Sequence, residues 1–210
     1  MAANIRKFKG MMQDDAFAPY HSINLEGPWE QWQSVPTTYR DHGLDTLHRD
    51  FPGCGPYHYT VSTGRNDLRE MRVAHDEEYL YFQVKTAAPI TPRADTNWMW
   101  LLIRVDGRDA SHWEGFHYQP TPTPGGLAPV PTEPNPGGGV GQEVGRAIFG
   151  RGENQLHIAV PRDTLGIQDG SVFVDFKWID NMRHPGEILD LYINGDTAPE
   201  GRFRYRYQGE

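Results

Sequence analysis

The feature that most constrains the fold is an alternation of apolar and polar residues that runs through short segments from about residue 68 to the C-terminus. A period of two is typical of strands that bury one face, and no stretch of this sequence keeps a helical period for three turns. We therefore expect strands over residues 69–74, 79–86, 98–105, 155–160, 172–179 and 202–207. Turn sequences such as Asp106-Gly107-Arg108 separate them, which favours antiparallel neighbours.

These strands predict an all-β fold, an antiparallel β-sandwich. The 210 residues are enough for one sizeable core, so we expect a single domain over residues 1–210. Its N-terminal segment, residues 1–30, has a looser pattern and is expected to be loosely structured. The looser pattern extends to about residue 68, and there Trp29 and Trp32 indicate either a short turn or an edge strand.

Residues 120–145, PTPTPGGLAPVPTEPNPGGGVGQEVG, are rich in proline and glycine. Proline has no backbone N–H and glycine weakens strands, so the composition predicts a long surface loop without a ladder. Loops of this length are either functional or without fixed structure. Two interpretations stay open: a loop that flanks a ligand and a flexible insertion.

Alternation divides each expected strand into two faces. The first face is apolar and predicts the sandwich core; it comprises Leu80, Phe82, Val84, Met99, Leu101, Ile103, Val105, Leu156, Ile158, Val160, Val172, Val174, Phe176, Trp178, Phe203, Tyr205 and Tyr207. The second face is polar but rich in aromatic rings; it comprises Tyr79, Tyr81, Gln83, Lys85, Trp98, Trp100, Arg104, Gln155, His157, Asp175, Lys177, Arg202, Arg204 and Arg206.

Aromatic rings beside planar hydrogen-bonding groups suit a pyranose, whose C–H face stacks on a ring while its hydroxyls need donors and acceptors. We expect carbohydrate binding, with Trp98, Trp100, Trp113 and Tyr118 as stacking residues and Arg104, Gln83 and His157 as hydrogen-bonding residues. The alternative is that Trp98 and Trp100 are covered by the Pro/Gly-rich loop or by the N-terminal segment and form a second, smaller core. Trp113 and Tyr118 would then anchor the base of the loop.

Charge narrows the class of partner. The formal net charge of −8 disfavours nucleic acid and anionic membranes, because both attract a basic surface. No apolar run is long enough to span a bilayer, and the first residues lack the apolar core of a signal peptide. Cys54 is the single cysteine, which excludes an internal disulfide.

Several segments together resemble one known pattern: GRNDLREMRVAHDEEYLYFQVKT, WMWLLIRVDG, HWEGFHY, NQLHIAVPRDTLGI, FVDFKWIDN and INGDTAPEGRFRYRY. The chain resembles the carbohydrate-binding modules of family 9 and the DOMON-like sandwiches that are appended to glycoside hydrolases. The resemblance implies a jelly-roll-like sandwich, a structural calcium ion and sugar recognition by tryptophan stacking. It also implies an accessory domain of a larger carbohydrate-active enzyme, secreted or extracellular, with a catalytic domain as its partner in the parent chain.

Calcium takes oxygen ligands, which are typically gathered on loops. The resemblance points to Asp45, Asp50, Asn66 and Asp67 in turn-rich sequence as metal ligands. The alternative is that Asn66 and Asp67 cap a turn through side-chain to backbone hydrogen bonds. A second acidic group, comprising Asp180, Asn181, Asp190 and Asp196, either serves another site or is solvated.

We expect no catalytic residue, because no nucleophile motif, metal-hydrolase motif or phosphate loop occurs. Two alternatives to a carbohydrate-binding module remain at this stage. One is a structural accessory domain that binds no sugar. The other is a small glycoside hydrolase or lyase, which would need a carboxylate pair drawn from Glu114, Asp175, Asp180 and Glu187.

Overall fold

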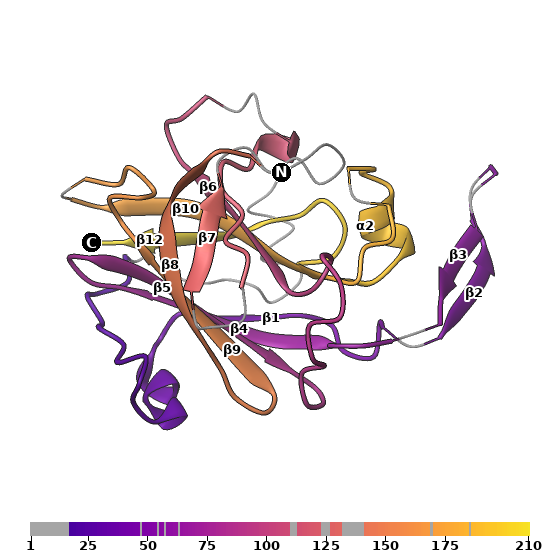
Figure 1. Cartoon of the computed structure of the whole chain (residues 1–210), viewed down its shortest axis with the longest axis horizontal. Coiled ribbons are helices and arrows are strands. Elements are labelled where there is room, and N and C mark those ends of the chain that lie inside the picture. The colour runs from indigo at the N-terminus through magenta and orange to yellow at the C-terminus, as the bar shows by residue number, and fades with distance from the viewer. Residues whose placement is uncertain are drawn as a thin grey trace.

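The computed structural model describes most of the chain (Figure 1). The described residues are 17–46, 48–53, 55–56, 58–62, 64–109, 113–122, 127–131, 141–168, 170–184 and 186–210. Cys54, residues 1–16 of the N-terminal segment and residues 123–126 and 132–140 of the Pro/Gly-rich stretch lie outside them. The described residues confirm the all-β prediction, since antiparallel sheets pack against each other around one main core.

The larger sheet has six strands in the order β1-β4-β5-β9-β8-β7. Their bounds are β1 Thr38–Arg40, β4 Leu68–His75, β5 Tyr79–Thr86, β7 Leu127–Pro131, β8 Glu143–Arg151 and β9 Gln155–Pro161. Each neighbouring pair is antiparallel. This sheet forms one layer of the sandwich; in Figure 1 its strands β1, β4, β5 and β9 lie below the smaller sheet, and β7 and β8 extend up to the level of that sheet.

The smaller sheet is built on β10, Val172–Asp180. One edge of β10 pairs with β6, Trp100–Val105, and the other edge pairs with two strands in succession. These are β12, Tyr205–Gly209, along the first half of β10 and β11, Asp196–Ala198, at its end. β10 is therefore the central strand of the second layer.

The predicted core face is buried between the two sheets at every position except Phe203. Phe176 on β10 contacts Phe82 on β5 edge to face, with ring centroids 5.6 Å apart, and also contacts Tyr39 and Tyr205. Phe203 is 62% exposed. It precedes β12, in a segment that pairs with no strand, so the alternation of the strand does not extend to it.

The prediction that residues 120–145 form no ladder is wrong. β7 lies within this stretch and pairs with β8 in a register that places Pro129 opposite Arg146 and Pro131 opposite Glu143. The arrangement is possible because β7 is an edge strand, where alternate N–H groups have no partner strand and proline costs no ladder bond.

The remaining elements are short. The 3₁₀ helix η1, Trp29–Ser34, shows that Trp29 and Trp32 belong to a helical turn and not to an edge strand. A second 3₁₀ turn, η2, spans Trp113–Gly115, and the helix α2 spans Asp190–Ile193. The hairpin of β2, Arg49–Pro52, and β3, His58–Val61, projects from one end of the sandwich (Figure 1).

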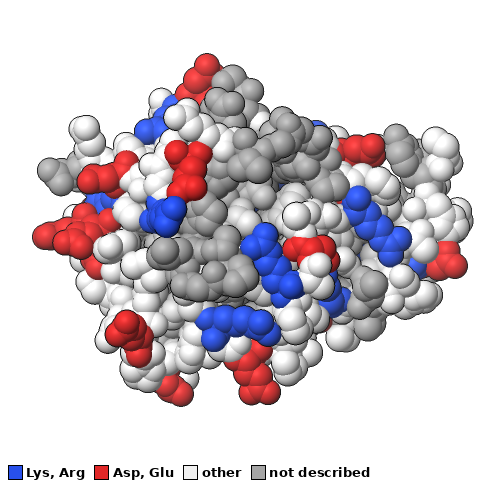
Figure 2. All heavy atoms as spheres, in the orientation of Figure 1, with Lys and Arg blue, Asp and Glu red and all other residues white. Residues whose placement is uncertain are grey.

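Charged side chains do not gather by sign on the face drawn in Figure 2, where acidic and basic residues are interspersed. The net charge of −8 is therefore not gathered into a single acidic field on that face.

Among the described helices, none combines the length and the apolarity that crossing a membrane requires.

Phe176 and Phe203 give a matched test of this core. Phe176→Ala removes a ring packed between both sheets and should lower the free energy of unfolding by about 3–5 kcal/mol. Phe203→Ala removes an exposed ring and should change it by less than about 0.5 kcal/mol. Urea unfolding followed by circular dichroism measures both, and equal losses would contradict the assignment of the core.

Candidate functional site

The predicted exposure of Trp98 and Trp100 is wrong, since the two residues are 3% and 4% exposed, and for Trp98 the predicted outward orientation is wrong as well. Met99 between them adopts a positive φ of 48°, which interrupts the alternation on which the prediction depended. Trp98 consequently lies in the main core and donates its indole N–H to the Thr91 carbonyl at 2.8 Å. Trp100 lies on the outer side of β6, where Leu102, Phe116, Ile179, Met182 and Leu191 join it in a second core.

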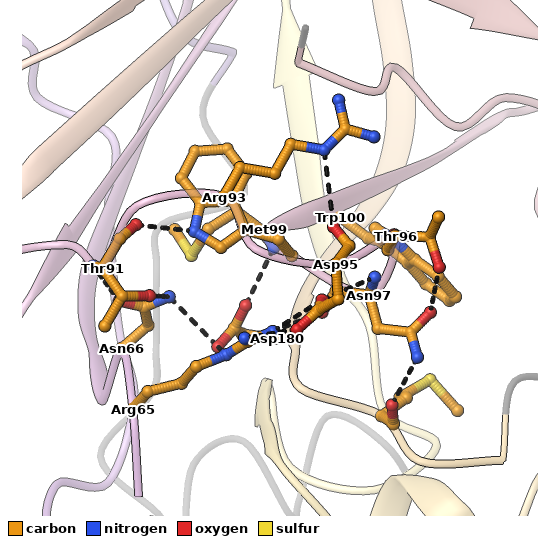
Figure 3. Close-up of polar contacts among 12 residues, drawn as sticks. Arg65, Asn66, Thr91, Arg93, Asp95, Thr96, Asn97, Met99, Trp100 and Asp180 are labelled. Carbon is orange, nitrogen blue, oxygen red and sulfur yellow. Dashed lines mark hydrogen bonds and ion pairs between the residues drawn. The ribbon is translucent and has the colours of Figure 1, made fainter. Parts of the chain in front are cut away.

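A buried polar network around Asp180 holds this kink (Figure 3). One carboxylate oxygen of Asp180 accepts the backbone N–H of Met99 at 2.9 Å. The other accepts from the Arg65 guanidinium at 3.0 Å and from the Asn66 amide at 3.1 Å. Burial raises the pKa of Asp180 to about 6, although Arg65 opposes the shift. Asn66 also accepts the Thr91 N–H at 2.8 Å, so both ends of its amide are bound within this network.

Three further predicted sugar-binding residues are also buried. Tyr118 lies in the main core, while Gln83 and His157 lie on the outer side of the larger sheet beneath residues 21–35. Trp29 stacks on the imidazole of His157 with ring centroids 4.2 Å apart, and Trp32 donates its indole N–H to Nδ1 at 3.3 Å. The alternative of a second, smaller core is thus correct only in part: Trp100 lies in such a core, but Trp98 lies in the main core, and the N-terminal segment covers His157 instead.

This contact should make the fold acid-sensitive. Burial lowers the pKa of His157 to about 4, so between pH 6.5 and 4 the unfolded chain binds more protons and stability is lost as the pH falls. We expect a loss of about 2 kcal/mol between pH 7.5 and 5 from this residue. Urea unfolding at both pH values measures the loss. His157→Asn keeps an acceptor for Trp32 but does not titrate, and an equal loss in this variant would contradict the assignment.

Trp113 and Arg104 are the predicted sugar-binding residues that keep access to solvent. Trp113 begins η2, is partly buried against the second core, and donates its indole N–H to the Gly186 carbonyl at 3.3 Å. The adjacent Glu114 forms an ion pair with Arg202 at 2.9 Å. The backbone N–H of Arg202 in turn donates to the Tyr192 hydroxyl at 3.2 Å.

These contacts link Trp113, through its neighbour Glu114, to Arg202, which precedes one exposed ring, Phe203, and contacts another, Tyr192. Tyr192 on α2 is 46% exposed, and Phe203 directly follows Arg202. We call Trp113, Tyr192 and Phe203 the aromatic surface. Sequence patterns missed Tyr192 because α2 is too short to show a period. They assigned Phe203 to the core because the predicted strand began at residue 202, whereas β12 begins at Tyr205.

Beside the aromatic surface, the outer side of the smaller sheet carries charged groups. Arg104 and Arg206 both bind the carboxylate of Asp175, at 3.3 Å and 2.8 Å. Arg204 lies with its guanidinium carbon 5.3 Å from the centroid of the Phe116 ring. Lys177 was predicted to face outward but is 1% exposed, because its ammonium binds the carbonyls of Pro199 and Phe203.

Three of the four carboxylates considered for a hydrolase, all but Glu187, are held in ion pairs. Glu114 pairs with Arg202, Asp175 with Arg104 and Arg206, and Asp180 with Arg65. A glycosidase pair needs two carboxyl groups facing one bond, with one of them free to carry a proton. The contacts made by these three acids do not favour that arrangement.

An acidic cluster forms at one end of the sandwich. The carboxylates of Asp41, Asp45 and Asp196 offer oxygens that lie within 4.8 Å of one another. Asp41 follows β1, Asp45 lies in the next turn and Asp196 begins β11, where it accepts the Leu68 N–H at 2.6 Å. Asp67, just before β4, lies near these three and we count it with them; its Oδ2 accepts the Leu44 N–H at 3.2 Å and pairs with Arg69 at 3.5 Å. Burial raises the pKa of Asp45 and of Asp196, and the charge of Asp67 adds to both shifts.

Several oxygens of the acidic cluster lack a hydrogen-bond donor among the described residues. They are both carboxylate oxygens of Asp45, Oδ2 of Asp41 and Oδ1 of Asp67. Asp67 is only 8% exposed. Burial, followed by the charge of Asp45, raises the pKa of Asp41 to about 7. Buried carboxylate oxygens without donors are a costly arrangement that a cation would relieve.

The structure changes the predicted metal ligands. Asp45 and Asp67 belong to the acidic cluster, but Asn66 is bound in the Asp180 network and Asp50 on β2 forms an ion pair with His58. Asp196 was assigned to a separate group, and Asp41 was missed. The only signal for Asp41 was its spacing of four residues from Asp45 in the turn sequence DHGLD.

Comparison with known proteins gives no relative: no protein-family model, no curated protein and no solved structure matches the chain. Functional conclusions therefore depend on its own geometry. That geometry offers two features at the surface, the aromatic surface with its neighbouring arginines and the acidic cluster.

Proposed function

We propose that this chain is a non-catalytic carbohydrate-binding β-sandwich whose sugar site is the aromatic surface. The observation that carries the proposal is the grouping of the accessible rings of Trp113, Tyr192 and Phe203 around one ion pair, Arg202 with Glu114. Rings supply the apolar faces on which a pyranose stacks. The ion pair supplies donors and acceptors for its hydroxyls.

Two of the three rings, those of Trp113 and Tyr192, are held in place before any ligand arrives. The indole N–H of Trp113 is fixed by Gly186, and Tyr192 lies against Gly201, where a Cβ would collide with the tyrosine ring. Gly201 has a φ of 61°, so its lack of a side chain serves both the turn and the close approach of Tyr192. Fixed rings lose little conformational entropy on binding, which favours affinity.

The resemblance to family 9 carbohydrate-binding modules supports the same proposal, although it pointed to other rings. As an accessory domain of a larger carbohydrate-active enzyme, the chain would hold a catalytic domain near a polysaccharide. An extracellular location would follow from that role.

We also propose that the acidic cluster binds calcium. Asp41, Asp45, Asp67 and Asp196 provide only oxygen donors, which suits Ca²⁺ and not a softer metal. The unpartnered Oδ1 of the buried Asp67 is the second observation that points to a cation. Calcium there would join the ends of β1 and β4 in the larger sheet to β11 in the smaller sheet.

Calcium should stabilise the fold by mass action. At a hundredfold excess of Ca²⁺ over its Kd the gain is about 2.7 kcal/mol, which corresponds to a rise in Tm of roughly 5–10 °C over the EGTA-treated protein. Scanning calorimetry measures this. Asp45→Asn and Asp196→Asn should remove most of the calcium-dependent rise, whereas Asp50→Asn should keep it. The same Tm in calcium and in EGTA would refute the site.

Sugar binding should depend on the exposed rings and not on those of β6. In glycan arrays followed by calorimetry on the glycan that binds, Trp113→Ala and Tyr192→Ala should weaken binding about tenfold or more, a loss of about 1.4 kcal/mol. Phe51→Ala removes another exposed ring, from the β2–β3 hairpin, and should leave the affinity unchanged. Absence of binding to every glycan, or wild-type affinity in both ring variants, would overturn the proposal.

A further inference from the structure

Arginines concentrate beside the aromatic surface, in a chain whose net charge is −8. Arg104 on β6, Arg206 on β12, and Arg202 and Arg204 in the segment before β12 occupy the outer side of the smaller sheet. Contacts link all four to this one region: Arg202 to Glu114 of η2, Arg204 to Phe116, and Arg104 and Arg206 to Asp175. We call these four residues the arginine face.

The acids on this side do not neutralise the arginine face. Asp175 is shared by Arg104 and Arg206, of which Arg206 also lies 3.7 Å from Asp106, and Glu114 pairs with Arg202. Four guanidinium groups therefore face three carboxylates. Arg204 forms no ion pair with any residue in the described part of the chain.

Two guanidinium groups also have donors without acceptors among the described residues. Nη1 of Arg204 and Nε of Arg104 are buried and make no hydrogen bond. Burial lowers the pKa of Arg204, and the neighbouring charges of Arg104 and Arg206 lower it further, against the opposing effect of Asp175. An anion bound beside the exposed parts of Arg104 and Arg202 would relieve the repulsion between the cations.

From this excess of cations we infer that the sugar recognised by the aromatic surface is acidic, a glycan that carries uronic acid carboxylates. The inference rests on the proposed carbohydrate binding and names its ligand class. A guanidinium binds a carboxylate through two parallel hydrogen bonds, which gives orientation as well as energy. The adjacent rings select a pyranose that bears the carboxylate over an acidic peptide, because a peptide lacks the flat C–H face that stacks on them.

The test compares a polygalacturonate oligosaccharide with the same oligosaccharide after reduction of its carboxyl groups. Calorimetry should give about tenfold tighter binding of the acidic form, equivalent to about 1.4 kcal/mol, and the difference should shrink as salt is added. Arg202→Gln and Arg204→Gln should each remove most of the difference. Arg40→Gln, an exposed arginine on β1, should leave it unchanged. Arg202 is itself exposed, so its variant keeps the test valid if the Arg204 variant is unstable.

The outcomes separate this inference from the proposed function. Equal affinity for the acidic and the reduced oligosaccharide overturns the acidic ligand class but leaves carbohydrate binding intact. Failure of both oligosaccharides and of every glycan on an array overturns the proposed function. Polyglutamate bound as tightly as the acidic oligosaccharide would show recognition of charge alone. Tighter binding of a sulfated polymer would show that sulfate, and not carboxylate, is the recognised group. Either result overturns the inference.

Discussion

The carboxylate of Asp180 holds the backbone turn that places Trp98 in the core, where its ring cannot contact a ligand. It lies at the end of the central strand β10 and binds Arg65, Asn66 and the backbone of Met99 from its two oxygens. The hydrogen bond to Met99 holds that residue in a left-handed conformation. The segment directly before β6 therefore changes direction, and Trp98 enters the core. A buried carboxylate with two side-chain donors and one backbone donor is well compensated, so the kink persists.

The alternation of the sequence predicted which residues face the core, and it succeeded where strands are continuous, as along β5, β9 and β10. It failed at Trp98, where the positive φ of the following Met99 breaks the period, and at Phe203, which lies before the start of β12. A period of two also does not show whether another segment of the chain covers the outward side of a strand. Gln83 and His157 do lie on the outer side of the sheet, but both are buried, and Trp29 and Trp32, which are distant in the sequence, cover His157.

The acidic cluster likewise depends on contacts between residues that are far apart in the sequence. Its members come from the segment after β1, the segment before β4 and the start of β11, and only the packing of the two sheets brings them together. Local sequence showed turn-rich acidic stretches without indicating which of them meet. Without a cation, the raised pKa of Asp41 means that the folded state binds more protons than the unfolded state between about pH 4 and 7, so stability is lost as the pH rises through that range.

One segment connects the two surface features. Residues 190–204 carry Tyr192 and Phe203 of the aromatic surface and also Asp196 of the acidic cluster. The buried ammonium of Lys177 ties this segment to β10 through the carbonyls of Pro199 and Phe203. A cation that fixes Asp196 would therefore fix the start of the stretch that presents both rings, since α2 and the turn at Gly201 flank β11 on either side. Metal binding and ligand binding would then be coupled through the ordering of one piece of backbone, with no direct contact between cation and sugar.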